Sequence, residues 1–292
     1  GENASGTWVS SHKGVWHLSE STNAENQDST SNSNNGIPQN SPLSITGKIG
    51  KALNFNYGNK DGDKDEDKDK DKDKDNDKVG VNTLIELGTK DSLDLSNVNT
   101  PDWTISLWVK PDPEFANNEY PVMYAYGDYL ATVGLSSKEG NEVGLIENYL
   151  NDASGLYSEN ALTTDAWNHV VVTRDDSKTK FYLNGNANGS GNSVDIDKDE
   201  DDYGSFIGGW TDTFSNEPYA EGNLKGVIDE VRVSNVVRTP DWIKQSYDLV
   251  QDQGVHVSIG DEVEAQLGPR LLGNLNVDNR FEAYISTDDS ER

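Results

Sequence analysis

The stretch WNHVVVTRDDSKTKFYLNG, residues 167–185, decides the fold class because it contains two strand-like runs joined by a polar turn. WNHVVVTRD leads into the turn at 175–178, and KFYLNG returns and ends at the turn pair Asn184-Gly185. Short runs rich in β-branched and aromatic residues, separated by a few polar residues, are typical of antiparallel hairpins. The stretch therefore predicts a hairpin.

The same kind of pattern recurs along the chain. In TISLWVK (104–110), residues Ile105, Leu107 and Val109 share one face of the expected strand, and Trp108 lies on the other. Regular alternation through GVIDEVRVS (226–234) predicts Val227, Asp229, Val231 and Val233 on one face and Ile228, Glu230 and Arg232 on the other. Further short strands are expected at GVWHLS (14–19) and GSFIGGW (204–210). Many short strands separated by Gly, Asn and Asp turns predict an all-β antiparallel sandwich or jelly roll.

Helical periodicity is strongest in PDWIKQSYD (240–248). Pro240 suits the first position of a helix, and Ile243 and Tyr247 are four residues apart, so that they share a helix face. We expect one short helix at this place.

Composition excludes several classes of function. The chain has 292 residues, a formal net charge of −28, no cysteine and one methionine. So negative a protein repels nucleic acid and anionic membranes and attracts cations, and no apolar run is long enough for membrane insertion. The absence of cysteine excludes disulfides and thiolate metal sites. The composition favours an extracellular or cell-surface protein.

The order of these segments resembles the laminin-G-like, concanavalin A-like lectin jelly rolls of prokaryotic surface proteins. The resemblance rests on four stretches of this sequence: GVWHLSE with DSTSNSNNG (14–36), GKIGKALNF (47–55) with DSLDLSN (91–97), WTISLWVKPD (103–112), and the run from WNHVVVTRD to TPDWI (167–243). It implies one antiparallel jelly-roll β-sandwich over residues 1–264. Two parts depart from the family: an Asp/Lys-rich acidic insertion at 59–78, and a C-terminal extension at 265–292 that contains one potential extra strand.

The resemblance also implies a structural calcium ion at the edge of the sandwich. Its expected ligands are Asp28 and Asn34 of the Asn/Gly-rich loop and Asp229 of the IDEVRV strand. Calcium prefers several hard oxygen ligands, and such loops supply them. An alternative for Asp229, which the alternation places on an apolar face, is that it caps a loop by accepting backbone N–H groups.

Two acidic segments are further candidates for calcium. NKDGDKDEDKDKDKDKDNDK (59–78) has Asp at every odd position from 61 to 77, including Asp61, Asp63, Asp65 and Asp67. An extended strand would place these carboxylates along one edge, where cations could bind in series. The spacing lacks the Gly and Glu that an EF-hand loop requires, so a solvated polyampholyte loop is the alternative. VDIDKDEDDYG (194–204) offers Asp197, Asp199 and Asp201, or is an ordinary polar loop.

Aromatic residues cluster in PVMYAYGDY (121–129) and after FIGG. Exposed rings stack on the faces of sugars, which makes Tyr126, Tyr129, Trp210 and Tyr219 candidate carbohydrate-binding residues. Burial in the core is the alternative for each ring. Trp108, Trp167 and Trp242 fall where the resemblance places core residues.

We expect no enzymatic activity. A glycosidase needs two carboxylates facing one cleft, and regular alternation puts Asp229 and Glu230 on opposite faces of their strand. His169 lies within a predicted strand and is expected to be structural. Two functions remain. The chain is a calcium-binding structural or adhesive subunit that self-associates, or associates with other surface proteins, in a filament, sheath or surface layer; alternatively, it is a calcium-dependent module of a larger surface protein that binds glycans.

Overall fold

The computed structural model describes residues 7–55, 83–89, 91–95, 102–115, 121–126, 131–136, 144–149, 155–193, 204–210 and 222–251. The chain divides into two compact units, Gly1–Val257 and Ser258–Arg292, and the described residues all belong to the first. The predicted acidic insertion at 59–78 and the predicted extension at 265–292 lie outside the described residues.

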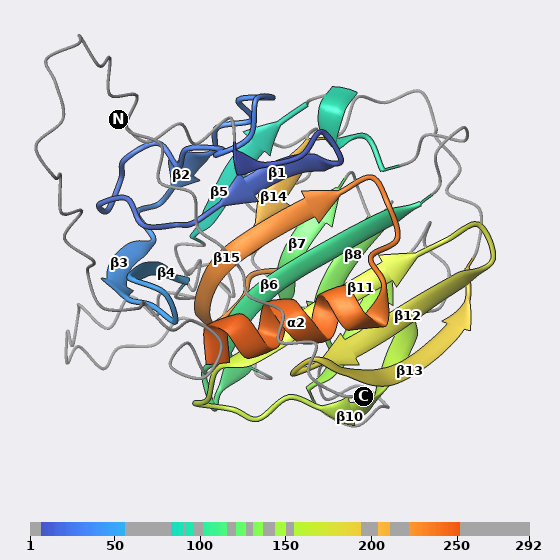
Figure 1. The fold of residues 1–292 in the computed structure, drawn as a ribbon. Helices are drawn as coiled ribbons and strands as arrows, with labels where there is room; N and C mark the ends of the chain where they lie inside the picture. The colour runs from blue at the N-terminus through green and yellow to red at the C-terminus, as the bar shows by residue number, and fades with distance from the viewer. Residues whose placement is uncertain are drawn as a thin grey trace, which may run out of the picture. The chain divides into compact units, whose positions relative to one another are not determined.

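Eight antiparallel strands form a front sheet, which faces the viewer in Figure 1. Its order is β13-β12-β11-β6-β15-β4-β3, and β1 pairs with the second half of β15, beyond the residues that pair with β4. The strands are β1 (His12–Trp16), β3 (Leu43–Thr46), β4 (Lys51–Phe55), β6 (Trp103–Pro111), β11 (Asn168–Arg174), β12 (Lys178–Leu183), β13 (Asn186–Asn192) and β15 (Gly226–Ser234).

A seven-stranded back sheet lies behind it, with the order β10-β9-β8-β7-β14-β5-β2 (Figure 1). Its strands are β2 (Ile37–Gln39), β5 (Leu84–Gly88), β7 (Val122–Tyr126), β8 (Ala131–Leu135), β9 (Leu145–Tyr149), β10 (Leu156–Ala161) and β14 (Ser205–Ile207). A short 3₁₀ helix, η1 (Asp91–Leu93), follows β5. The predicted antiparallel jelly-roll sandwich is therefore confirmed.

The main hydrophobic core fills the space between the two sheets. On β6 it receives Ile105, Leu107 and Val109, as the alternation predicts, and on β11 it receives Val170 and Val172. Each of these side chains is at least 99% buried, and complete burial of one aliphatic side chain stabilises the fold by about 1.5–3 kcal/mol. The alternate residues of β6 and β11, which lie between these core residues, therefore point the other way, onto the outer face of the front sheet.

Helix α2 (Pro240–Gln251) crosses that outer face (Figure 1), and it is the one α-helix that the described residues form. Thr239 precedes it, and the Thr239 hydroxyl accepts the N–H of Trp242 at 3.2 Å, as an N-cap does. Ile243 is fully buried against Val171 and Tyr182 of the sheet. The predicted helix is confirmed, and no described helix is long and apolar enough to cross a membrane.

Strand β15 contains a bulge that overturns the predicted faces of its residues. Glu230 has a φ of +53°, and the pairing with β6 shifts register between Asp229 and Arg232. Because of this extra residue, Ile228, Val231 and Val233 all enter the core. Regular alternation failed here because a bulge breaks the period of two. Asp229 and Arg232 therefore point away from the core on the outer face.

All three of the expected core tryptophans are also placed differently. Trp108 is 2% exposed, but it packs on the outer face of the front sheet and not between the sheets. Trp167 and Trp242 are only half-buried. His169 is buried within β11 at 4% exposure, which confirms the structural environment expected for it.

Candidate functional site

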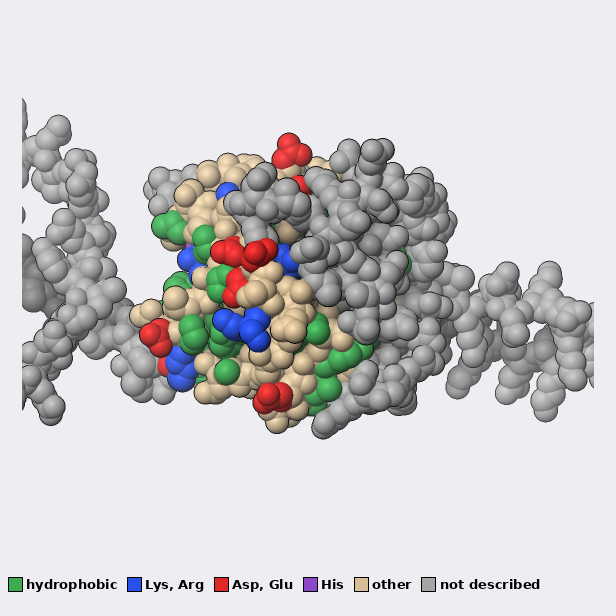
Figure 2. All heavy atoms as spheres, turned by 90° about the vertical axis from the view of Figure 1, so that its right-hand side faces the viewer, with side chains coloured by type: hydrophobic (Ala, Val, Ile, Leu, Met, Phe, Trp, Pro, Cys, Tyr) green, Lys and Arg blue, Asp and Glu red, His purple; other side chains and the backbone are tan. Residues whose placement is uncertain are grey.

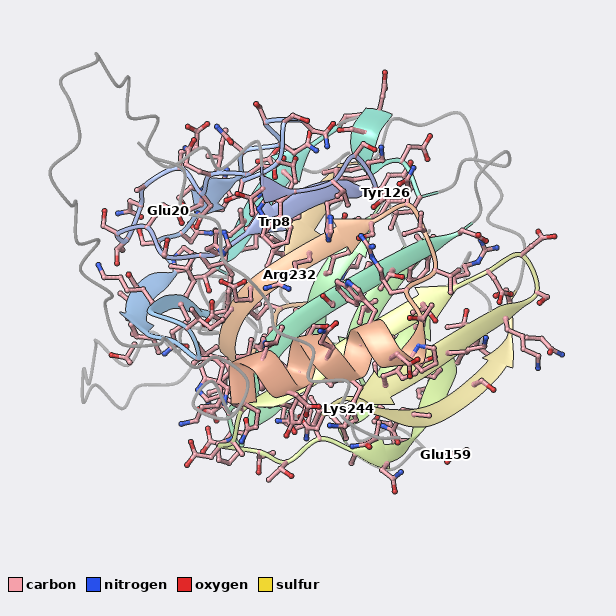
Figure 3. All side chains as sticks on the ribbon, in the orientation of Figure 1. Trp8, Glu20, Tyr126, Glu159, Arg232 and Lys244 are labelled. Carbon is pink, nitrogen blue, oxygen red and sulfur yellow. The ribbon has the colours of Figure 1, made fainter. Side chains whose placement is uncertain are left out.

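The pairing of β1 with β15 builds a cluster of aromatic and charged side chains on the outer face of the front sheet. Val15 is paired with Arg232, and Trp16 with Val231. The chain before β1 turns back through the bond from the His12 N–H to the Val9 carbonyl, 2.9 Å long. This turn brings Trp8 to Arg232, as Figure 3 shows above α2. We call this the Trp8 cluster: Trp8, His12, His17, Glu230, Arg232, Arg238 and Trp242.

Glu230 is the electrostatic centre of the Trp8 cluster. One carboxylate oxygen lies 2.6 Å from His17 Nδ1, and the other lies 2.7 Å from Arg232 Nη2. Burial opposes ionisation of Glu230, but the bond to His17 and the charge of Arg232 outweigh it and lower the pKa of Glu230. The same bond raises the pKa of His17. Glu230 is therefore ionised and held in place at neutral pH.

The Trp8 ring is half-buried and is fixed by its neighbours. The Arg232 guanidinium lies 5.2 Å from the centre of the Trp8 ring, within the range of a cation–π contact. His12 meets the same ring edge to face at 5.0 Å, and His17 lies 6.2 Å away. One part of the ring is thus held by three side chains while another part reaches solvent.

A second half-buried tryptophan, Trp242 of α2, closes the other side of the cluster. The Arg238 guanidinium lies 4.8 Å from the Trp242 ring, and its Nη2 bonds the hydroxyls of Ser11 and Ser234 at 3.1 Å. His12 lies between the two tryptophans, 6.5 Å from Trp242. Burial, together with the charges of both arginines, lowers the pKa of His12 to about 4, so this imidazole is neutral at pH 7.

A second aromatic group lies in the middle of the same face. Trp108 of β6 has Asp229 and His169 as its cross-strand partners on β15 and β11. The Tyr247 ring of α2 stacks on Trp108 at 5.7 Å with an interplanar angle of 18°. Lys48 Nζ lies 4.7 Å from the Trp108 ring. We call Trp108, Asp229, His169, Tyr247 and Lys48 the Trp108 group.

Some of the charged side chains elsewhere on the described surface form ion pairs. Figure 2, which shows the right-hand side of Figure 1, has acidic and basic side chains next to each other among hydrophobic ones. Ion pairs join Lys180 to Asp175 and Lys110 to Asp165, at 3.9 Å and 2.8 Å. All four side chains are at least one-third exposed, so such pairs contribute about 0–1 kcal/mol each.

The calcium ligands expected from the resemblance have other partners here. Asp28 Oδ1 accepts the N–H groups of Val15 and Thr30, and Oδ2 accepts the Thr30 hydroxyl and the Asn34 N–H, all at 2.8–3.0 Å. Asn34 Oδ1 accepts the Ser92 hydroxyl. Four donors surround the Asp28 carboxylate, whereas a calcium ion requires further oxygen ligands around it. The residues of this loop therefore do not fit a calcium ion in this conformation.

Asp229 belongs to a different set of contacts. Its Oδ2 accepts the Ile49 N–H at 2.9 Å, as the loop-capping alternative predicts. Burial raises the pKa of Asp229 to about 7; the charge of Glu230 adds to this, and the Ile49 bond opposes it. Among the residues that the structure describes, no three or more His, Asp or Glu side chains gather as a metal site.

The predicted aromatic residues are buried where they are described. Tyr126 belongs to the main core, and its hydroxyl bonds Asp94 at 2.7 Å. Trp210 is 7% exposed and packs with Leu84, Val122, Ala125 and Phe206. These contacts favour the core alternative for both rings. Tyr129, Tyr219, Asp61, Asp63, Asp65, Asp67, Asp197, Asp199 and Asp201 lie outside the described residues.

Sequence reasoning missed most of the Trp8 cluster. His17 and Glu230 are 213 positions apart, and only the pairing of β1 with β15 joins them. The bulge at Glu230 then sets Asp229 and Arg232 on one face, and no local pattern predicts it. A usable signal was the presence of His12 two residues before the predicted strand at 14–19 and of His17 within it.

Comparisons with solved structures show the same fold. Domain 4 of AbnA, a GH43 extracellular arabinanase from Geobacillus stearothermophilus in complex with arabinotriose, is 19% identical with a TM-score of 0.54, covering 80% of this chain and 97% of that one. The binding domain of Paraclostridial Mosquitocidal Protein 1 is 14% identical with a TM-score of 0.53, covering 80% and 52%. Trypanosoma rangeli sialidase in complex with sialic acid is 12% identical with a TM-score of 0.54, covering 84% and 33%.

A search of curated proteins finds no match. A family model of the laminin-G type, described as the concanavalin A-like lectin/glucanases superfamily, matches residues 87–244, which is more than half of the chain. This match includes β6, β11, β12 and β15, the strands that hold the centre of the front sheet. The chain therefore belongs to the concanavalin A-like lectin/glucanases superfamily.

Proposed function

We propose that the chain is a non-catalytic carbohydrate-binding module that acts outside the cell or at its surface. The observation that carries this proposal is the half-exposed Trp8 ring, held by Arg232 and His12 beside an ionised Glu230. Recognition of sugars combines an aromatic face, on which the C–H groups stack, with charged or polar groups that bond the hydroxyls.

The parts of the Trp8 cluster divide these tasks. Trp8 and Trp242 offer two partly exposed rings on either side of His12. Each carboxylate oxygen of Glu230 has a lone pair beyond the one used by His17 or Arg232, and the Arg232 guanidinium has five N–H donors. Because these groups already hold one another in position, ligand binding orders few side chains, which limits its entropic cost.

Family membership supports the ligand class. AbnA domain 4, whose fold is similar, was solved with arabinotriose, so a domain of this fold can hold an oligosaccharide. The alternatives are a calcium-dependent role of the acidic segments at 59–78 and 194–204, and self-association through 265–292. We rank these below glycan binding because the Trp8 cluster is built entirely from described residues.

The geometry of the acidic pair favours binding over catalysis. Asp229 is fully buried, and Glu230 is 5% exposed with both oxygens bonded. Hydrolysis of a glycoside needs one carboxyl group to protonate the leaving oxygen and a second to act as nucleophile or base. Glu230, held ionised between His17 and Arg232, can accept hydrogen bonds from hydroxyls but has no proton to give a leaving oxygen, and Asp229 is buried, so the pair does not supply the acid and nucleophile of a glycosidase.

The test is a glycan array followed by calorimetric titration of the best-bound oligosaccharide. We expect Trp8→Ala to weaken binding at least about tenfold, since stacking on one ring contributes about 1–3 kcal/mol. Trp167→Ala is the matched control, because Trp167 is also half-buried but lies outside the Trp8 cluster. Equal affinity of wild type and Trp8→Ala, or no binding to any glycan, would overturn the proposal.

A further inference from the structure

Trp108 forms the centre of a row of three side chains across the front sheet. Asp229 on β15 and His169 on β11 are its direct cross-strand partners. Directly opposed residues of antiparallel strands have Cβ atoms about 4.5–5.5 Å apart, so one polar group stands on each side of the indole. The row therefore presents an aromatic surface between a carboxyl group and an imidazole.

Both flanking groups have a buried polar atom that no described residue satisfies. Asp229 Oδ1 and His169 Nδ1 have no partner in good hydrogen-bond geometry, although the two residues are 0% and 4% exposed. The backbone N–H groups of Lys48 and Glu230 lie near the Asp229 carboxyl group and lower its pKa against the larger effect of burial, but neither forms a well-aligned bond to Oδ1. An unpaired buried polar atom costs about 1–3 kcal/mol, and folded proteins leave few of them. The two unpaired atoms lie on opposite sides of the same ring, which makes them candidates for one shared ligand.

The place above the Trp108 ring is taken by another ring. Tyr247 lies nearly parallel to Trp108, and its ring centre is 6.1 Å from that of His169. Lys48 covers the indole from a second element and bonds Gln251 in the last turn of α2, at 2.8 Å. A flat ring stacked on an indole occupies the position that the face of a pyranose takes on a tryptophan.

The two halves of α2 are held differently. Its first half is anchored by the Thr239 cap and by fully buried Ile243. Its second half leaves Leu249 40% exposed and contacts the sheet through Tyr247. Contact of the second half with the sheet therefore depends mainly on the Tyr247 and Lys48 side chains that cover Trp108, and a change of their rotamers would uncover the indole.

We propose that Trp108, Asp229 and His169 form a second sugar-binding position, which Tyr247 and Lys48 cover in the unliganded protein. The ligand is a neutral sugar ring stacked on Trp108. Its hydroxyls bond Asp229 Oδ1 on one side and His169 Nδ1 on the other. A hydroxyl suits both atoms because it can donate to the carboxyl oxygen and either donate to or accept from the imidazole nitrogen.

This inference rests on the proposed function for its ligand class, but it uses none of the residues of the Trp8 cluster. Arg232 connects the two places, because its charge lowers the pKa of His169 in addition to the larger effect of burial, which together bring that pKa to about 3. His169 is therefore neutral at pH 7, and its unpaired nitrogen can bond a hydroxyl in either tautomer. An oligosaccharide that reaches both positions would cross the outer face of the front sheet.

The test uses the whole chain and three neutral trisaccharides, arabinotriose, cellotriose and maltotriose, in calorimetric titrations. Tyr247→Ala and Lys48→Ala each remove part of the cover from a different element. We expect each to tighten binding of at least one trisaccharide about threefold to tenfold, because a ligand no longer has to displace the covering side chain. Adding Asp229→Ala to Tyr247→Ala removes the acceptor and should reverse that gain. Leu249→Ala is the control on the same half of α2.

Each outcome separates this inference from the proposed function. If Trp8→Ala abolishes binding while Tyr247→Ala and Lys48→Ala both bind as tightly as wild type, the covered position is refuted and the Trp8 cluster stands. If Trp8→Ala has no effect and both uncovering variants gain affinity, the Trp108 position stands and the proposed Trp8 site falls. If no variant binds any trisaccharide while its unfolding midpoint shows it to be folded, the covered position is refuted.

Discussion

The Asp28 carboxylate is the clearest place to test how the Asn/Gly-rich loop is held, because one side chain accepts four hydrogen bonds. It bonds three backbone N–H groups, from Val15, Thr30 and Asn34, and the Thr30 hydroxyl. These residues are at least 92% buried, so water does not readily replace the carboxylate. Asp28→Ala removes the shared acceptor and leaves three backbone donors unpaired.

An unpaired buried donor costs about 1–3 kcal/mol. If the loop relaxes toward water at one of the three donors, two remain unpaired, and we expect Asp28→Ala to lower the free energy of unfolding by about 2–6 kcal/mol. This is at the large end for a single substitution. Asp28→Asn keeps one carbonyl oxygen as an acceptor and should lose about half as much.

Equilibrium urea unfolding at pH 7, followed by tryptophan fluorescence, measures these losses. Each variant and the wild type are unfolded in calcium and again in excess chelator. The account predicts the same wild-type stability in both buffers. Two results would refute the reasoning: a loss below about 1 kcal/mol in Asp28→Ala, or a chelator effect on wild type as large as the effect of the substitution, which would make Asp28 a calcium ligand.

Three further predictions concern stability. Burial raises the pKa of Asp229 to about 7, above the usual carboxyl value of about 4. The protonated form therefore stabilises the fold below pH 4, and that contribution is lost as the pH rises through 7. In unfolding curves from pH 4 to 8, the free energy of unfolding of Asp229→Asn should rise relative to that of wild type by on the order of 2–4 kcal/mol. Asn188 joins β13 to β10 through bonds to Asn160, and Asn188→Ala should cost about 2 kcal/mol in urea unfolding. Thr239→Ala removes the cap of α2 and should cost about 1 kcal/mol, with Thr239→Ser near wild type.

Those features of the fold that depend on neighbouring residues could be predicted from the sequence. The hairpin of β11 and β12 follows from the runs on either side of the turn at 175–178, and it pairs Val170 with Leu183 as such a hairpin requires. The alternation in β6 and the start of α2 at Pro240 are equally local. In each case the spacing of the hydrophobic residues and the position of the turn or cap residues predict the same element.

The candidate site could not be predicted in the same way. The bulge places Glu230, which is not a glycine, at a positive φ, and only the contacts of the folded protein can favour that conformation. The bond between His17 and Glu230 depends on strands from opposite ends of the unit. Tyr126 belongs to a cluster of aromatic residues in the sequence, but its place on β7 directs its ring into the core.

The measurement that tests the central claim most directly follows the indole N–H resonances of the seven tryptophans by two-dimensional NMR during titration with the oligosaccharide that binds best. Substitution of Trp8 by Phe assigns its signal, and substitution of Trp210 assigns that of the back-sheet tryptophan. The account predicts that the Trp8 signal shifts first and most, together with the backbone amides of His17 and Arg232. Shifts confined to Trp210 and its neighbours on the back sheet, with Trp8 unchanged at saturation, would contradict it.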